Sequence, residues 1–184
     1  KRTIRISLPP NYHSLQPYPI IYALDGQDAF MYGRLATIVN YLILEKGMEP
    51  VIVVGIDVAR STRTEEYSPK GQDHSNFLKY IDNEVLPIVE KEFQIKHEGV
   101  NRLLIGDSLA AAAALSLAIH QRKYFQHILS LSGAFFEDSL DLIKGEEHLS
   151  WLNIWMLVGK KETKVETNRG SFNFLEINRS FKEE

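Results

Sequence analysis

The chain has 184 residues, 44% of them hydrophobic and 24% charged, with a formal net charge of −3 and no cysteine. This length predicts a single domain over residues 1–184 that buries roughly 70% of the surface of the unfolded chain. The interspersed charges argue against binding to nucleic acid or to a membrane, and the lack of cysteine excludes disulfides, a cysteine nucleophile and thiolate metal sites.

Alternating strand and helix patterns predict an α/β protein with a mostly parallel central sheet. The first eight residues alternate between apolar and polar side chains, which is typical of an edge strand, here expected to be antiparallel. Five later runs are short, apolar and rich in branched residues, as expected of strands buried on both faces. They cover residues 20–24, 51–56, 103–105, 128–131 and 154–158, with helical patterns at 35–46, 77–93 and 109–121. This alternation predicts right-handed crossovers between the strands.

A polar segment, residues 59–76, follows the strand at residues 51–56. In open α/β sheets the carboxyl ends of the strands border the ligand-binding crevice, so this segment, including Arg63, is a candidate wall of a pocket. The alternative is a solvated loop without a role in binding.

Residues 104–110 (LIGDSLA) place Ser108 between an apolar run and an alanine-rich helix. The small residues Gly106 and Ala110, two positions to either side, allow strand and helix to pack closely around a sharp turn that exposes the serine hydroxyl. A helix N-terminus also presents backbone N–H groups that can stabilise an oxyanion. The pattern predicts a nucleophile elbow, with a plain helix N-cap as the alternative.

Two backbone N–H groups are predicted to form an oxyanion hole beside Ser108. Leu109 directly follows the serine and provides the first. Gln27 provides the second, because the strand at residues 20–24 ends in Asp25 and Gly26, and the glycine permits a turn that aims the next N–H inward. A tight turn without a catalytic role is the alternative for this pair.

A serine nucleophile also needs a base, and an acid that orients the base. The acid is expected after a strand that follows the serine in the chain. Glu162 comes four residues after the apolar run at 154–158 and is the first choice, with Glu166 as runner-up. The alternative for Glu162 is a charge paired in water with the neighbouring lysines.

No histidine follows Glu162, although this chain order places the base after the acid. The six histidines are His13, His74, His97, His120, His127 and His148. Of these, His74 in the polar segment is the one internal candidate for the base. His120 lies near the far end of the predicted helix, about 18 Å from Ser108 at 1.5 Å per residue. The chain stops within a helical pattern, so we expect the catalytic histidine beyond Glu184.

Several motifs together resemble the esterase D family of α/β-hydrolases, which includes enterochelin-esterase-like proteins, S-formylglutathione hydrolases and mycolyltransferases. In chain order they are IYALDGQ (21–27), VVGI (53–56), RTEEYSP (63–69), residues 77–87, GDSL (106–109), LSGA (131–134) and VGKKE (158–162). The resemblance implies a three-layer α/β-hydrolase fold and a serine esterase with Ser108 as nucleophile. It implies Gln27 and Leu109 as oxyanion donors, an acid at or near Glu162, and a pocket close to Ser132 and Gly133.

The chain departs from this family at two places. The family usually has two glycines after the serine–leucine pair, where this chain has Ala110 and Ala111. Alanine is still small, so we expect a slightly tighter fit between helix and strand rather than a lost site. The family's Gly-Gly-His segment, which carries the base, is absent, and residues 59–76 are few for this family. We therefore expect a chain that is truncated at its C-terminus. We also expect that loop residues are missing within residues 59–76.

The leading hypothesis is hydrolysis of a small-molecule carboxylic ester through an acyl-enzyme at Ser108, with no metal or organic cofactor. A non-catalytic binding domain of the same fold and an acyltransferase are the alternatives. The sequence leaves the identity of the ester and the oligomeric state open. No apolar stretch approaches 18 residues, so no membrane span is predicted, and we expect a cytoplasmic protein.

Overall fold

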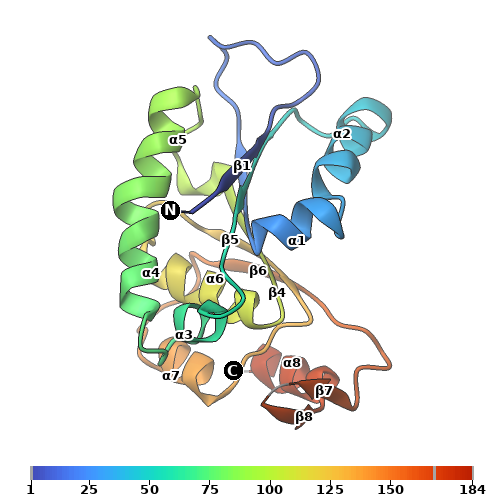
Figure 1. The fold of residues 1–184 in the computed structure, drawn as a ribbon, viewed down its shortest axis with the longest axis vertical. Coiled ribbons are helices and arrows are strands. Elements are labelled where there is room, and N and C mark those ends of the chain that lie inside the picture. Colours follow the sequence, from blue (N-terminus) through green and yellow to red (C-terminus); the bar gives the residue numbers. More distant parts are fainter. Residues whose placement is uncertain (1, 168, 184) are drawn as a thin grey trace.

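Six strands form one central sheet in the computed structural model, which describes residues 2–167 and 169–183 (Figure 1). They are β1 (Ile4–Ser7), β2 (Ile20–Leu24), β3 (Ile52–Ile56), β4 (Arg102–Asp107), β5 (His127–Leu131) and β6 (Asn153–Leu157). The spatial order is β1-β3-β2-β4-β5-β6, and every neighbouring pair is parallel except β1 and β3. The prediction of a mostly parallel sheet with an antiparallel N-terminal edge strand is confirmed.

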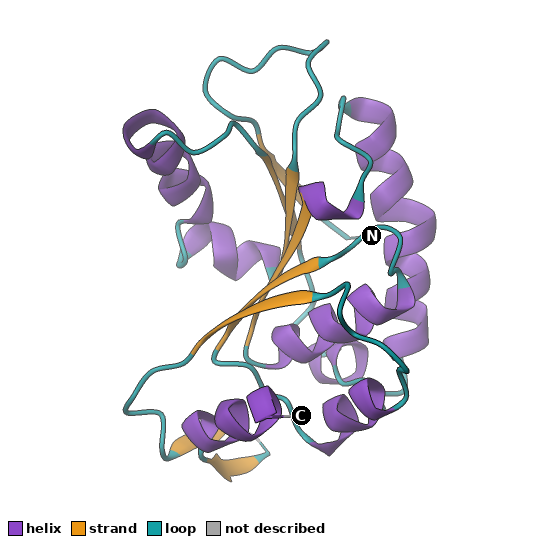
Figure 2. Ribbon diagram, turned by 180° about the vertical axis from the view of Figure 1, so that it is seen from behind, coloured by secondary structure: helices purple, strands orange, loops and turns teal. Residues whose placement is uncertain are grey.

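Helices cover both faces of this sheet and complete the predicted three-layer α/β fold (Figures 1 and 2). On one face, α1 (Gly26–Met31) and α2 (Leu35–Lys46) pack over a small apolar cluster. On the other face lie α4 (His74–Tyr80), α5 (Leu86–Glu92) and α6 (Leu109–His120), which close the larger core. The two cores meet only through the sheet, as in other proteins of this class.

The strands differ in how completely they are buried. Both β2 and β3 are buried at every residue, as the apolar runs predict for central parallel strands. In β6, however, the side chains alternate, and Trp155 and Leu157 are 52% and 57% exposed. The prediction that residues 154–158 are covered on both faces was therefore wrong, because in the described part of the chain helices lie over only one face of this strand.

Two helical segments differ from the sequence prediction. Residues 77–93 do not form one α-helix: a π-helical turn, η1 (Ile81–Val85), separates α4 from α5. Pro87 follows this turn and has no N–H to donate to the carbonyl four residues earlier, which favours a break in the regular ladder. The polar segment 59–76 is not a plain loop either, since it contains the short helix α3 (Arg63–Tyr67) and the start of α4.

The C-terminal part adds smaller elements at the edge of the sheet where β4 meets α6 (Figure 1). They are α7 (Glu137–Lys144), the hairpin of β7 (Val165–Thr167) and β8 (Gly170–Phe172), and α8 (Phe174–Glu183), while the short helix η2 (Gly99–Asn101) precedes β4. The rings of Phe135 and Phe181 stack with centroids 3.9 Å apart, which anchors α8 to the segment after β5.

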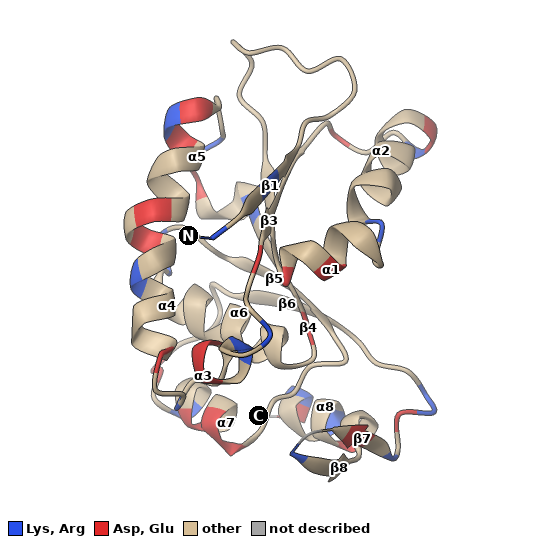
Figure 3. Ribbon diagram, viewed as in Figure 1, with Lys and Arg blue, Asp and Glu red and all other residues tan. Residues whose placement is uncertain are grey.

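Acidic and basic residues are interleaved along the chain, with both signs present on α3, α5 and α7 (Figure 3). This mixture matches the modest net charge of −3. Over residues 2–167 and 169–183, no helix combines the length and the apolar character needed to cross a membrane.

Candidate active site

Ser108 stands in a strained turn between β4 and α6. Its φ of 57° and ψ of −121° lie outside the regions that residues with a Cβ ordinarily adopt, which costs on the order of 1–3 kcal/mol. Main-chain hydrogen bonds hold the turn: the Ser108 N–H donates to the Leu131 carbonyl (2.8 Å), and the Ser108 carbonyl accepts from the Ala134 N–H (3.0 Å). The strain is therefore supported by the end of the neighbouring strand β5.

Close contact between β4 and α6 explains the small residues on both sides of Ser108. A side chain at Gly106 would overlap the main chain of Ala110 and Ala111. Both alanines are fully buried, as are the next three residues of α6. Alanine in place of glycine at these two positions is therefore compatible with the turn, as the sequence analysis expected.

Two backbone N–H groups at the carboxyl edge of the sheet have no hydrogen-bond acceptor among the described residues. Leu109 is the first residue of α6 and Gln27 the second of α1, and the first N–H groups of a helix have no acceptor within it. In the described part of the chain neither group donates a hydrogen bond. The strands before them, β2 and β4, are parallel neighbours whose last paired residues are Ala23 and Ile105. Both donors thus follow the carboxyl ends of adjacent strands.

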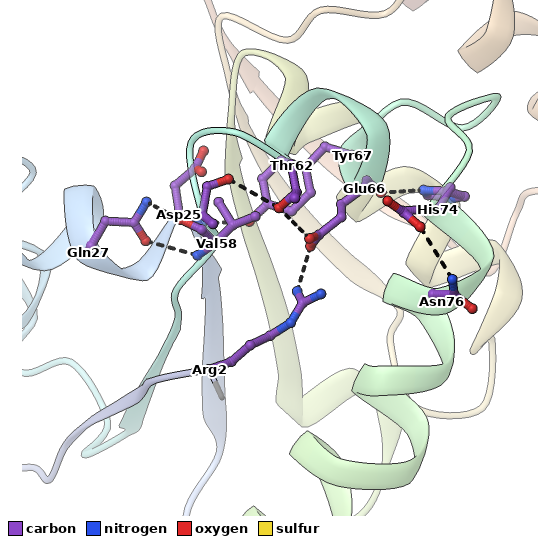
Figure 4. A network of polar contacts seen from close by, with 11 residues as sticks. Arg2, Asp25, Gln27, Val58, Thr62, Glu66, Tyr67, His74 and Asn76 are labelled. Carbon is purple, nitrogen blue, oxygen red and sulfur yellow. Dashed lines mark hydrogen bonds and ion pairs between the residues drawn. The ribbon is translucent and has the colours of Figure 1, made fainter.

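The turn after β2 is held by side chains. Asp25 adopts a left-handed conformation (φ 51°), and its N–H donates to the hydroxyl of buried Tyr67 (3.0 Å). The Gln27 amide forms two hydrogen bonds with the main chain of Val58, one to its carbonyl (3.2 Å) and one from its N–H (3.1 Å), as Figure 4 shows. A side chain at Gly26 would overlap the main chain of β3, so glycine is required here.

Arg63 was predicted to be part of a pocket wall. In the structure its guanidinium group forms hydrogen bonds with other residues of the protein. It forms a two-pronged ion pair with the Asp25 carboxylate, with Nε–Oδ1 and Nη2–Oδ2 distances of 2.8 and 2.7 Å. Its Nη2 also donates to the carbonyl of Asp107 (3.3 Å), the residue before Ser108. This double contact could not be predicted from the sequence, because it joins residues 38 and 44 positions apart.

Glu162, the first choice for the acid, lies at the same edge of the sheet. Its Oε1 accepts hydrogen bonds from the Ser132 hydroxyl (2.8 Å) and the Gly159 N–H (2.7 Å). Ser132 itself follows β5 with a positive φ of 47°. By contrast, the runner-up Glu166 is 71% exposed, with Lys164 as its ionic neighbour at 3.9 Å. The structure therefore brings Glu162 and Ser132 together and leaves Glu166 in solvent.

Gly133, the other predicted pocket residue after β5, contributes through its main chain. Its carbonyl accepts a hydrogen bond (2.8 Å) from the buried amide of Asn178 on α8. This bond ties the segment after β5 to the C-terminal helix.

The surroundings at this edge of the sheet raise the pKa of the Asp107 carboxyl above its usual range. Desolvation and the charge of Asp25 raise the pKa of Asp107, Arg63 lowers it, and Glu162 raises it further. Three acidic side chains and one arginine thus act on one another around Ser108. Among the residues described, no three acidic or histidine side chains are grouped closely enough to hold a metal ion.

None of the six histidines is placed to serve Ser108. His74, the one internal candidate, is buried, with Nδ1 2.7 Å from the Glu66 carbonyl and Nε2 2.6 Å from the Ser116 hydroxyl. Ser116 lies eight residues after Ser108 on α6, or about 12 Å along the helix axis. His120 pairs with Asp82, and the remaining four lie at the start of β5 or outside regular elements, at positions 13, 97, 127 and 148.

Ser108 opens into a cavity of about 140 Å³. Its walls are Arg63, Thr64, Ser108, Leu109, Ala134, Phe136, Thr167, Arg169 and Phe174. Gln27 does not line it. A larger, open cavity of about 690 Å³ shares Thr64, Phe136 and Arg169 with the first. The guanidinium of Arg169 lies 5.2 Å from the centre of the Phe136 ring, so the shared wall is an aromatic–cationic pair. The wall residues Thr167 on β7, Arg169 after it and Phe174 on α8 were not predicted, because their sequence carries no motif.

Two solved structures with a similar arrangement of strands and helices are a serine hydrolase and an esterase. An IroE-like serine hydrolase from Shewanella oneidensis is 20% identical with a TM-score of 0.74, over 99% of this chain and 63% of its own. The enterochelin esterase from Shigella flexneri is 19% identical with a TM-score of 0.80, over 99% of this chain and 45% of its own. At such identities the likeness establishes the α/β-hydrolase-like fold. This chain spans less than two thirds of either structure.

The sequence itself identifies the family. The family described as "Esterase: Putative esterase" matches residues 1–184, so the chain belongs to this esterase family. The uncharacterized protein YjcH of Bacillus subtilis is 32% identical over 98% of this chain and 76% of its own length. A second uncharacterized Bacillus subtilis protein, YbbA, is 23% identical over 88% of this chain and 69% of its own.

Proposed function

We propose that the protein is a serine hydrolase that cleaves small-molecule carboxylic esters through an acyl-enzyme intermediate at Ser108. Membership of the esterase family supports ester hydrolysis as the reaction class. The serine mechanism is supported by the local geometry, and it is the finer part of the proposal.

The strained turn at Ser108 is the observation that carries the proposal. A non-glycine residue with φ 57° and ψ −121° at a strand-to-helix turn is costly, and such strain persists mainly where function requires it. The turn presents the hydroxyl to a cavity and leaves the Leu109 N–H without an acceptor. We assign this turn as the nucleophile elbow.

In this mechanism Ser108 attacks the ester carbonyl, and the N–H groups of Leu109 and Gln27 stabilise the oxyanion of the tetrahedral intermediate. Glu162 orients the imidazole of the base, because two hydrogen bonds hold its carboxylate at the carboxyl edge of the sheet, where Ser108 also lies. We place the base on a histidine beyond Glu184, since the six histidines of residues 1–184 lie elsewhere. The proposed chemistry needs no cofactor.

The names of the structural neighbours suggest a range of esters to test. One neighbour is the enterobactin esterase from Shigella flexneri in the presence of enterobactin, and another is a siderophore hydrolase, EstB, from Aspergillus nidulans. These substrates belong to those proteins. For this chain we propose a small ester with an aromatic part, because Phe136 forms a wall of both cavities.

The test is the kinetics of the full-length protein on 4-nitrophenyl esters. We expect a burst of nitrophenol equal to the enzyme concentration when deacylation is slow, and loss of burst and turnover in Ser108→Ala. Residual burst in Ser108→Ala would contradict the assignment. Complete inactivity of the wild-type protein toward esters would favour the non-catalytic binding domain. Faster release of product on addition of an alcohol, with formation of the new ester, would identify an acyltransferase.

A further inference from the structure

We propose that Arg169 binds the substrate and selects esters whose acyl part carries a negatively charged group such as a carboxylate. The inference rests on the proposed function and deepens it, because it names the class of ester that Ser108 attacks. Arg169 binds the acyl part in this account and takes no part in the transfer of protons or of the acyl group.

Arg169 lies where the two cavities beside Ser108 adjoin. It follows β7 and precedes β8, in the hairpin that Figure 1 shows close to α8. It lines the cavity of about 140 Å³ into which Ser108 opens, and it also lines the open cavity of about 690 Å³. In an acyl-enzyme the acyl part stays on the serine and the alcohol departs. The acyl part therefore belongs in the smaller cavity, next to Arg169, and the alcohol leaves through the larger one.

An aromatic cluster holds the guanidinium group against the cavity wall. Its Cζ lies 5.2 Å from the centre of the Phe136 ring. The Phe136 ring in turn contacts Phe172 and Phe174, with centroid distances of 4.9 and 6.5 Å. A ring attracts a cation through its π face and does not use the forked N–H donors that match a carboxylate. The contact therefore locates the charge of Arg169 and leaves its directed donors for a ligand.

The guanidinium group of Arg169 has no carboxylate partner among residues 2–167 and 169–183. Its backbone N–H, by contrast, donates to the Thr167 hydroxyl (3.1 Å). Arg5 shows the usual arrangement of an arginine in this protein, a fork to the Asp57 carboxylate with two N–O distances of 2.8 Å. An unpaired guanidinium on a cavity wall favours an anionic ligand, because a carboxylate accepts two parallel N–H bonds from one such group.

The charges of the larger cavity disfavour an anionic alcohol. Its walls include the acidic side chains Glu65, Glu137 and Asp138. Lys70 lines the same cavity, but its ammonium group is paired with a carboxylate of α7. A negatively charged alcohol would meet the acidic walls, whereas a negatively charged acyl part meets Arg169. The charges therefore assign the anionic group to the acyl side of the ester.

The smaller cavity has room for an acyl part of about one aromatic ring. Its volume of about 140 Å³ is close to the roughly 150 Å³ of an apolar protein cavity that binds benzene. Phe136 and Phe174 on its walls offer apolar contact to such a ring. A benzoyl group with a carboxylate substituent therefore combines the size, the aromatic face and the charge that this cavity accommodates.

The experiment compares two esters of similar shape and different charge on the full-length protein. They are 4-nitrophenyl 4-carboxybenzoate, an anion at neutral pH, and the neutral 4-nitrophenyl 4-carbamoylbenzoate. We expect kcat/KM of Arg169→Ala to fall about 30-fold for the anion, mostly through KM, and less than about threefold for the neutral ester. Arg169→Lys keeps the charge but loses the fork, so we expect about a fivefold loss for the anion. The intrinsic reactivities of the two esters cancel, because their ratio is compared between variants.

The matched control is Arg122→Ala. The Arg122 guanidinium also lies over an aromatic ring, 5.0 Å from the centre of Trp151, but Arg122 lines neither cavity. Its preference between the two esters should equal that of wild type. An equal loss for both esters in Arg169→Ala, or an unchanged ratio, would overturn the inference. With Ser108→Ala inactive, either result leaves the proposed function standing.

Binding provides a readout that does not depend on catalysis. Calorimetric titration with the anion 4-carbamoylbenzoate should give Ser108→Ala a Kd about tenfold lower than that of Ser108→Ala/Arg169→Ala. The neutral benzene-1,4-dicarboxamide should bind the two proteins equally. Equal binding of the anion to both proteins, or no binding to either, would contradict the role of Arg169, even if Ser108 turned out to have no esterase activity.

Discussion

The turns after β2 and β4 lie at one edge of the sheet, but they are held by different means. The turn at Ser108 is fixed by main-chain hydrogen bonds to the end of β5 and by contact between Gly106 and α6. The turn at Asp25 is fixed by side chains, from Arg63, Tyr67 and Gln27. Substitutions that remove side-chain contacts should therefore disturb the Asp25 turn far more easily than the Ser108 turn. The exception is a larger side chain at the contact between β4 and α6, which should disturb the Ser108 turn.

The largest expected effect comes from removing the charge of the proposed acid. Glu162→Gln should lower kcat by about 10³- to 10⁴-fold with little change in KM, because the amide cannot stabilise a protonated imidazole. Steady-state kinetics on a 4-nitrophenyl ester measure this. Glu166→Gln is the control, since Glu166 is exposed, and a loss of similar size in that variant would move the acid to position 166.

The Ser108 turn should break when volume is added behind it. Gly106→Ala places a methyl group against the main chain of Ala110, and we expect a loss of about 1–3 kcal/mol in the free energy of unfolding together with at least a 100-fold loss of kcat. Urea unfolding followed by tryptophan fluorescence measures the first quantity. Gly145→Ala is the control, because a methyl group there meets its nearest neighbours at 3.4 Å. Equal effects of the two substitutions would contradict the account.

The Asp25 turn should respond in a graded way to loss of its side-chain contacts. Gln27→Ala keeps the N–H donor but removes both hydrogen bonds to Val58, so we expect kcat to fall about tenfold. Asp28→Asn, at the next position in the same helix, should change kcat less than twofold. If Gln27→Ala behaved like Asp28→Asn, the side-chain contacts of this turn would have no part in positioning the donor.

The smallest effect concerns pH and stability. Burial lowers the pKa of His74, against a smaller opposing effect of its contact with the Glu66 carbonyl. The unfolded chain therefore binds a proton more readily than the folded one as the pH falls below about 6.5, and stability should decline there by at most about 1.4 kcal/mol per pH unit. Urea unfolding from pH 7.5 to 5 should show a flatter profile in His74→Gln than in wild type. Parallel profiles would contradict this assignment.

Local sequence patterns were sufficient for the sheet and for the turn at Ser108. Branched apolar runs define buried strands, and the strained turn needs small residues at fixed spacing. Both features can therefore be recognised as sequence patterns within about seven residues. The contacts of Arg63 leave no such mark. A fork to Asp25 and a bond to Asp107 depend on how α3 is folded back against the sheet, and the polar composition of residues 59–76 predicted a loop.

The same limit applies to His74 and to β6. His74 was a candidate base because it lies in a polar segment of the sequence, whereas in the structure it is buried against α6. The apolar run at β6 predicted burial on both faces, but burial depends on which helices cover the strand. In each case the side chain's environment is set by residues distant in the chain.

The most direct test of the account is the intact mass of the full-length protein before and after incubation with a fluorophosphonate, followed by peptide mapping. An activated serine next to an oxyanion hole reacts covalently with this reagent, whereas an ordinary helix-capping serine does not. We predict a single adduct, mapped to Ser108 and absent from Ser108→Ala. No adduct on the folded protein, or an adduct on another residue, would contradict the assignment of Ser108 as the nucleophile.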